Sequence, residues 1–235
     1  MPDFSKRSYD EELMDDLTCS GEVIRQTLKE LETINTLLGG NHVTINGIQK
    51  LLDHARTNHF SLADLGCGGG DILRLIRRWA MRKKLVAELV GIDANPNIVN
   101  EAILYTPDPF NIRFESQDIF SPAFASRSFD VVTGTLFFHH FTNEQLTDFF
   151  RQLKKQARIG FVINDIHRHW FAYHSIKLLT KAFSKSPMVQ NDGPLSVLRA
   201  FKKHELIEIL KSAGIQSYSI RWMWAFRWQV IVYNS

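Results

Sequence analysis

Short apolar runs alternate with amphipathic stretches over most of the chain. The amphipathic segments carry apolar residues at helical spacing, as in the group Ile72, Leu75, Ile76 and Trp79. Strands and helices that alternate in this way are typical of βαβ units, so the sequence predicts an α/β fold around a mostly parallel sheet. The five predicted strands cover residues 60–65, 87–92, 112–115, 129–133 and 159–163.

The first 59 residues precede this alternation and show a helical pattern. Ile24 and Leu28 lie on one helical stripe, which the Gly39-Gly40 pair terminates. A second, short helix is predicted after Asn46, because Ile48, Leu51 and Leu52 fall on one side. We therefore expect an N-terminal helical cap over residues 1–59.

The remainder, 60–235, is predicted to form one larger domain with an insertion. Residues 165–200 break the alternating rhythm and mix helical with loop character, so we expect a mobile lid over the sheet, placed after the fifth strand. Residues 215–233 are expected to form two final strands joined near Ala225. Three residues that disfavour regular helix interrupt the insertion, namely Pro187, Gly193 and Pro194.

Composition adds constraints on the class of protein. The chain has 235 residues, of which 44% are hydrophobic and 23% are charged, as in soluble globular proteins. No apolar run approaches the length of a membrane span, and the polar N-terminus lacks the apolar core of a secretory signal. Only two cysteines, Cys19 and Cys67, are present, which favours a reducing cytoplasm. The net charge of +3 is too small to indicate nucleic acid, and we expect a monomer or a homodimer.

The strongest motif is the glycine loop Asp64-Leu65-Gly66-Cys67-Gly68-Gly69-Gly70-Asp71, between a predicted strand and helix. Its glycines allow a sharp turn and close approach of a ligand to the backbone. The spacing differs from the G-x-G-x-x-G pattern of dinucleotide-binding loops. Acids at 64 and 71 would repel a pyrophosphate but accept hydrogen bonds from an ammonium group. The loop therefore favours a zwitterionic ligand with an amino acid portion.

Two further acids follow the next strands. Asp93 ends the second strand, where it can accept both hydroxyls of a ribose or, alternatively, cap the next helix. Asp118 follows the third strand, where it can accept from an adenine amino group while Ile119 packs on the ring; a polar loop end is the alternative.

These segments resemble the class I S-adenosylmethionine-dependent methyltransferases, in residues 62–72, 89–96, 115–120 and 129–141. The resemblance implies a Rossmann-like seven-stranded methyltransferase sheet whose last strand is antiparallel. It also implies S-adenosyl-L-methionine as cofactor. The residues it assigns to that cofactor are Asp64, Gly66, Cys67 and Gly68 in the glycine loop, Asp93 and Ala94 at the ribose and adenine, Asp118 and Ile119 at the adenine, and Thr135 and Leu136 beside the sulfonium.

Acceptor residues are expected just after the fourth and fifth strands, because substrates of such folds lie outside the carboxyl ends of the strands. His139, His140 and His167 are candidates for a general base, although a histidine here can also simply pack the start of a helix. An Asp-x-His-x-His run begins at Asp165, but we expect no metal. The candidates for binding the acceptor are Arg168, His169, Trp170 and Tyr173.

Several acceptor classes remain open. The apolar insertion favours a small hydrophobic or aromatic acceptor methylated on oxygen or carbon, and residues 164–201 also resemble bacterial enzymes related to quinone and polyketide tailoring. No Asn-Pro-Pro-Tyr or Asp-Pro-Pro-Tyr run follows the fourth strand, which argues against methylation of base amines. The alternatives are an RNA methyltransferase, a nicotinamide-dependent oxidoreductase and a non-catalytic cofactor-binding partner protein.

Overall fold

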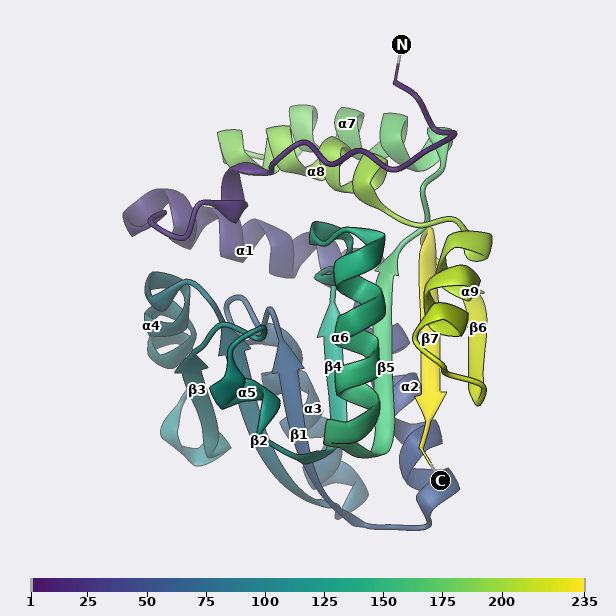
Figure 1. Ribbon diagram of the computed structural model, residues 1–235. Helices are drawn as coiled ribbons and strands as arrows, with labels where there is room; N and C mark the ends of the chain where they lie inside the picture. The colour runs from purple at the N-terminus through teal and green to yellow at the C-terminus, as the bar shows by residue number, and fades with distance from the viewer. Residues whose placement is uncertain (1, 235) are drawn as a thin grey trace.

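A single seven-stranded sheet forms the centre of the molecule (Figure 1). The computed structural model describes residues 2–234, and its strands follow the order β3-β2-β1-β4-β5-β7-β6. Six strands share one direction, and β7 runs antiparallel to both of its neighbours. This confirms the predicted fold class. The strands are β1 (His59–Leu65), β2 (Val86–Asp93), β3 (Ile112–Ser116), β4 (Phe129–Thr135), β5 (Ala157–Ile166), β6 (Tyr218–Met223) and β7 (Arg227–Tyr233).

Helices cover both faces of the sheet. α2 (Gly40–Ala55) and α3 (Asp71–Lys83) share one buried cluster with the strands. α6 (Asn143–Gln156), α9 (Lys203–Ser212) and the short α5 (Pro122–Ala125) share the other. α4 (Pro96–Tyr105) packs against β2 and β3. Three single turns of 3-10 helix complete the connections: η1 (Leu13–Asp15), η2 (Asp108–Phe110) and η3 (Phe138–His140).

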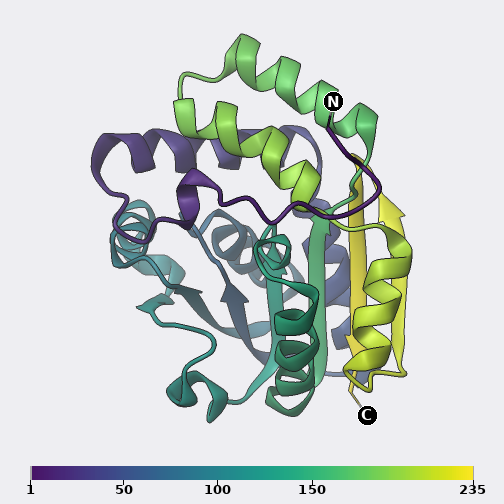
Figure 2. The same cartoon turned by 45° about the horizontal axis from the view of Figure 1, so that its top comes forward.

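A third layer lies beyond the carboxyl ends of the parallel strands (Figures 1 and 2). It consists of α1 (Gly21–Leu37), α7 (Trp170–Phe183) and α8 (Pro187–Arg199). The N-terminal segment, residues 2–20, runs between α8 and the start of α6 before it reaches α1 (Figure 2). This layer covers the edge of the sheet where the candidate site residues gather. No helix within residues 2–234 is both long and apolar enough to cross a membrane.

The predicted cap is not a unit separate from the sheet. α2 begins at Gly40 rather than after Asn46, because Gly39 has φ +72 and turns the chain directly from one helix into the next. Ile48 and Leu51 of α2 are fully buried in the same cluster as β1. The predicted division at residue 59 therefore cuts through one core, and only the residues before α2 lie over the strand ends.

The predicted insertion is more regular than its composition indicates. Pro187 stands in the first turn of α8, where no N–H is needed, and Ser186 caps that helix by accepting a hydrogen bond from the backbone N–H of Val189 at 3.3 Å. Gly193 and Pro194 lie inside α8 instead of breaking it. A Cβ on Gly193 would lie 3.4 Å from Ile176 and Thr180, which places this position at the contact between α8 and α7.

Candidate active site

The glycine loop joins β1 to α3 in a conformation that requires glycine. Gly66, Gly68 and Gly70 have φ values of +62, +50 and +74. A Cβ on Gly66 would also lie 2.1 Å from the ring of Phe137. Backbone and packing therefore both exclude a side chain at this position.

Three carboxylates surround this loop, and Arg74, whose charge acts on Asp71, is bound instead to Glu32 and to the carbonyl of Gly69. Asp64 is 2% exposed, and its Oδ1 has no hydrogen-bond partner among the described residues. Burial, followed by the nearby Asp71 and Asp93, raises the pKa of Asp64 well above its usual value. Burial, followed by the charge of Glu32, raises the pKa of Asp71 to about 6. A bound ammonium group would relieve this repulsion, so the loop fits the amino acid end of the cofactor.

Asp93 lies at the end of β2, where it is bound to the glycine loop. Its Oδ2 accepts from the backbone N–H of Gly68 at 3.2 Å, and its Oδ1 accepts from that of Asn95 at 3.0 Å. Burial raises its pKa, against the effect of these two N–H groups and of nearby His140. Asn95, not Asp93, caps α4. The alternative of a helix cap is therefore excluded, and a role at the ribose stays a prediction.

The other predicted cofactor residues lie at the same edge of the sheet. Ala94 and Asp118 are exposed, and Ile119 is buried. Thr135 Oγ1 lies 2.8 Å from Thr44 Oγ1 of α2. Leu136 has φ +56 and donates its N–H to the carbonyl of Asn164 at 2.8 Å, which fixes the backbone where the sulfonium is expected.

Cys67 takes a different role from the one predicted. Its side chain is 3% exposed and belongs to the core cluster beneath the loop, while its N–H donates to the carbonyl of Ile92 at 3.1 Å. Both groups are therefore engaged within the fold. Cys67 supports the loop from below instead of contacting a ligand.

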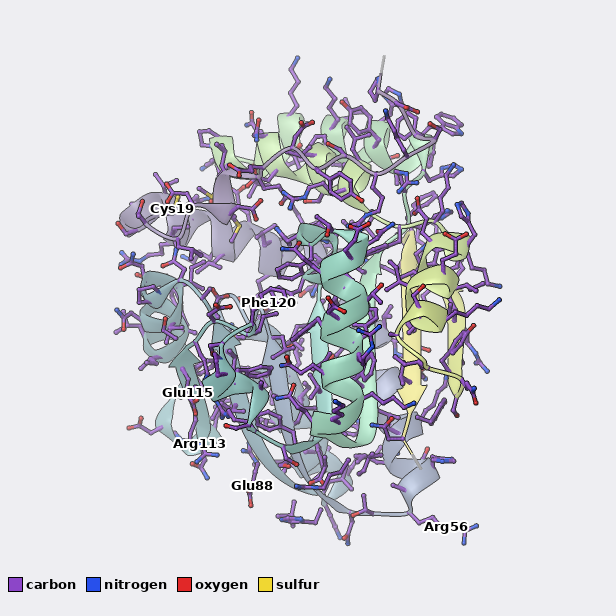
Figure 3. The ribbon with its side chains drawn as sticks, in the orientation of Figure 1. Cys19, Arg56, Glu88, Arg113, Glu115 and Phe120 are labelled. Atoms are coloured by element: carbon purple, nitrogen blue, oxygen red, sulfur yellow. The ribbon has the colours of Figure 1, made fainter. Side chains whose placement is uncertain are left out.

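Aromatic and aliphatic side chains border the loop on its acceptor side. The ring of Phe137 lies 5.1 Å from that of Phe141, which lies 5.2 Å from that of Phe120. Phe120 is located between the strand ends and α1 (Figure 3). Leu28 of α1 comes within 3.6 Å of the position of a Cβ on Gly68. The surroundings of the glycine loop are thus apolar on two sides.

A buried ion network lies between the end of β4 and the N-terminal segment; it comprises Glu12, Asp15, His139, His140, Asp165 and Arg199. His139 Nδ1 lies 2.7 Å from Asp165 Oδ1, and His139 Nε2 lies 3.5 Å from Glu12 Oε1. His140 Nδ1 lies 2.6 Å from Asp15 Oδ1. The network places two side chains of the N-terminal segment, Glu12 and Asp15, directly on the predicted histidine pair.

The two histidines of the pair differ in environment. Burial opposes a charge on His139, but Asp165 and Glu12 outweigh it and raise the pKa of His139 to about 9. At neutral pH His139 therefore holds a proton on both ring nitrogens and cannot accept another. The side chain of His140 is 21% exposed, against 2% for His139. The sequence left open which histidine of the pair is the base, and this difference in exposure distinguishes the two rings.

One group of three side chains has its ligand atoms close enough together for a metal ion, namely Glu12, His139 and His140. Arg199 already supplies positive charge there. Its Nε lies 3.6 Å from Glu12 Oε1, and its Nη1 lies 2.6 Å from Asp15 Oδ2. The guanidinium and the protonated His139 thus place two positive charges among the three carboxylates of this network.

The predicted acceptor residues after β5 do not form one group. Arg168 is 1% exposed and binds Glu205 through two nitrogens, at 2.6 and 3.1 Å, while its Nε donates to the carbonyl of Phe4. The guanidinium N–H groups of Arg168 are hydrogen-bonded within the protein. Arg168 therefore anchors the N-terminal segment to α9 and is not free to bind an acceptor.

The remaining members lie along the start of α7. The ring of His167 lies 4.8 Å from that of Trp228, and burial lowers its pKa to about 4. His169 caps α7 by accepting from the N–H of Phe171 at 3.2 Å. Trp170 is exposed, and the ring of Tyr173 lies 5.6 Å from that of Phe4. None of these contacts joins them to the histidine pair.

Sequence reasoning missed Arg7, Glu12, Asp15 and Arg199. Arg7 is buried and donates to the carbonyls of Arg199, His139 and Phe141 at 2.7, 2.9 and 2.9 Å. These residues lie in polar stretches that resemble solvated surface, and their partners are more than a hundred residues away in sequence. Of the ion network, the sequence pattern indicated His139, His140 and the Asp165 run, but none of these four residues.

Comparisons agree with this arrangement. A model of the methyltransferase domain family matches residues 62–160, and no curated protein matches the chain significantly. Human N-acetylserotonin methyltransferase, solved with SAM, aligns with a TM-score of 0.66 at 13% identity, over 98% of this chain and 63% of the human chain. The plantazolicin methyltransferase BpumL, solved with SAH and a substrate analogue, aligns with a TM-score of 0.66 at 15% identity, over 90% and 91%. Magnesium protoporphyrin IX methyltransferase from Synechocystis PCC 6803, solved with SAH, gives 0.53 at 16%, over 86% and 87%.

Residues 62–160 thus match the methyltransferase domain family, and the fold is shared with solved methyltransferases that bind SAM or SAH. Because the solved neighbours are only 13–16% identical to this chain, they show a shared fold and nothing more. The chain spans less than two thirds of the human enzyme, so that enzyme's substrate is not transferred to it.

Gly66 provides a first test of the loop. Gly66→Ala combines a left-handed backbone with the clash against Phe137, whereas Gly214→Ala meets the same backbone demand, at φ +71, in open space. We expect Gly214→Ala to cost about 1 kcal/mol of unfolding free energy and to bind S-adenosylhomocysteine normally. Gly66→Ala should cost more and lose binding in calorimetry. Equal behaviour of the two variants would contradict the proposed fit.

The pKa of His139 gives a second, pH-dependent test. Because the folded pKa of about 9 lies above the ordinary 6.5, its contribution to stability is complete below pH 6.5. It is lost as pH rises through about 9. We expect the unfolding free energy from urea titrations to fall by roughly 3 kcal/mol over that interval. His139→Gln should flatten the dependence, and exposed His174→Gln should leave it unchanged; a flat wild-type profile would refute the ion pairs.

Proposed function

We propose that this chain transfers a methyl group from S-adenosyl-L-methionine to a small hydrophobic or aromatic acceptor, on oxygen or carbon. The observation that carries the proposal is the unpartnered carboxylate of Asp64 beside the glycine loop, with Asp71 and Asp93 adding negative charge. This charge suits the ammonium of the cofactor. When bound, the cofactor supplies an electrophilic methyl group on a positive sulfur.

The acceptor preference rests on the apolar residues around the loop. Phe120, Phe137 and Phe141 form a continuous set of ring contacts, and Leu28 covers the glycine loop from α1. An apolar wall excludes water and holds a flat or aliphatic acceptor next to the methyl carbon. Alignment of this kind supplies most of what methyl transfer requires from a protein.

A proton must leave a neutral hydroxyl acceptor as its oxygen attacks the methyl carbon. Of the three predicted bases we propose His140. Its ring is the more exposed of the pair, and Asp15 orients its Nδ1. The oxygen would form the new bond to carbon, the carbon–sulfur bond would break with its electron pair going to sulfur, and the proton would pass to His140. His139 would stay protonated and pair with the carboxylates of Asp165 and Glu12.

The alternatives receive less support. Glycines at 66, 68 and 70 flanked by acids disfavour the pyrophosphate of a nicotinamide cofactor. A net charge of +3 gives little electrostatic basis for RNA binding. A non-catalytic cofactor-binding partner protein would have no need of an accessible histidine beside the donor. The two free cysteines support the proposed cytoplasmic location.

Cofactor-dependent transfer can be tested with a labelled methyl donor. We expect label to enter phenolic or polyketide-like acceptors and not RNA, and we expect S-adenosylhomocysteine to bind more tightly than NAD. Asp93→Ala removes an acceptor for ribose hydroxyls worth roughly 1.5–3 kcal/mol each, so affinity should fall tenfold or more. Asp53→Ala, on an exposed position of α2, is the control. Preferential binding of NAD, or transfer to RNA alone, would overturn the proposal.

The role of His140 is tested separately. His140→Gln should lower turnover at saturating acceptor by roughly 10²–10⁴-fold while affinity for S-adenosylhomocysteine stays unchanged. His174→Gln, an exposed histidine on α7, should not change turnover. Normal turnover of His140→Gln would mean that the acceptor is already ionised or that alignment alone drives transfer.

A further inference from the structure

The outer helix α7 presents large apolar side chains to solvent. Trp170, Phe171, Leu178 and Phe183 are 57%, 49%, 70% and 81% exposed. The opposite side of the helix, with Ala172 and Thr180, is buried where it packs on α8. α7 lies at the outside of the third layer in both ribbon views (Figures 1 and 2). An apolar helix face left open to water in this way is unusual for a protein that functions only in solution.

The exposed surface continues from α7 onto the turn between β6 and β7. The ring of Phe171 lies 5.9 Å from that of Phe226, and that of Trp222 lies 5.9 Å from the same ring. Trp222 and Trp224 are 46% and 67% exposed. We call the set Trp170, Phe171, Leu178, Phe183, Trp222 and Trp224 the aromatic face. Two segments that are some forty residues apart in sequence thus form one apolar surface.

The segment that carries most of this face contains basic residues and no acidic ones. Residues 166–191 contain no aspartate or glutamate, whereas Lys177, Lys181 and Lys185 follow one another along α7 and the turn after it. Glu30 of α1 reaches this turn, where its carboxylate accepts hydrogen bonds from the Ser184 hydroxyl and from the backbone N–H of Lys185. The apolar side chains are therefore flanked by cations whose charge no acid on the same segment offsets.

We propose that the aromatic face docks on the surface of a bilayer that contains anionic phospholipid. Tryptophan favours the boundary between headgroups and acyl chains, and lysines beside an apolar helix face bind anionic headgroups. A second copy of the chain fits less well, because a two-fold contact would bring the same lysines together. The inference does not depend on the identity of the methyl acceptor.

Vesicle binding by the untagged protein of residues 1–235 tests this directly. We expect cosedimentation with vesicles that contain phosphatidylglycerol and much weaker binding to phosphatidylcholine alone. Trp79 and Trp228 are buried, so a blue shift of tryptophan emission would report on Trp170, Trp222 and Trp224. Leu178→Ser with Phe183→Ser should weaken binding at least tenfold, since each removes an apolar side chain from the contact. Lys177→Glu with Lys181→Glu should abolish the preference for anionic vesicles.

Matched controls lie on distant helices. Met81 of α3 and Leu104 of α4 are 65% and 73% exposed, and Met81→Ser with Leu104→Ser should leave vesicle binding unchanged. All of the substituted side chains are exposed, and thermal unfolding would verify that each variant folds. Absence of binding to anionic vesicles, or equal binding by wild type and Leu178→Ser/Phe183→Ser, would overturn the proposal. So would a lipid-free dimer in sedimentation velocity that this double variant dissociates, because a second copy would then cover the face.

Discussion

One buried imidazole between two carboxylates holds the acceptor side of this enzyme together. His139 comes from the loop after β4, Asp165 from within β5 and Glu12 from the N-terminal segment. Charges as deeply buried as these persist only when they are paired, because removal of one partner leaves an uncompensated ion in a medium of low polarity. The pairing therefore fixes three segments that are far apart in sequence, and the path of the N-terminal segment over the strand ends follows from it.

The two groups of acidic residues differ in their electrostatics. Around His139, the positive charges of His139 and Arg199 lie among the carboxylates of Glu12, Asp15 and Asp165. Around the glycine loop, Asp64 and Asp71 have raised pKa values, because burial and nearby acids disfavour their charge. A cationic group bound beside the glycine loop would lower these pKa values.

The sequence predicts those features of the structure that depend on residues close together in the chain. Strand positions and the glycine loop follow from apolar periodicity and from backbone conformations that only glycine accepts readily. Asn164 and Asp165 read as a loop because they are polar, yet they lie inside β5, where Asn164 donates to Gly40 and Thr44 at 2.8 and 2.9 Å. Arg168 was misassigned for the same reason. Buried polar residues depend on partners that are distant in sequence, and no local pattern reveals them.

The N-terminal segment has a consequence for the order in which the molecule is assembled. Glu12 and Asp15 leave the ribosome more than a hundred residues before their partners His140 and Arg199. Arg7 likewise waits for the carbonyl of Arg199. The segment must therefore stay unattached until nearly the whole sheet has been synthesised, and contacts of such long range close slowly. Translation thus completes the glycine loop early, and the ion network only after Arg199 has been synthesised.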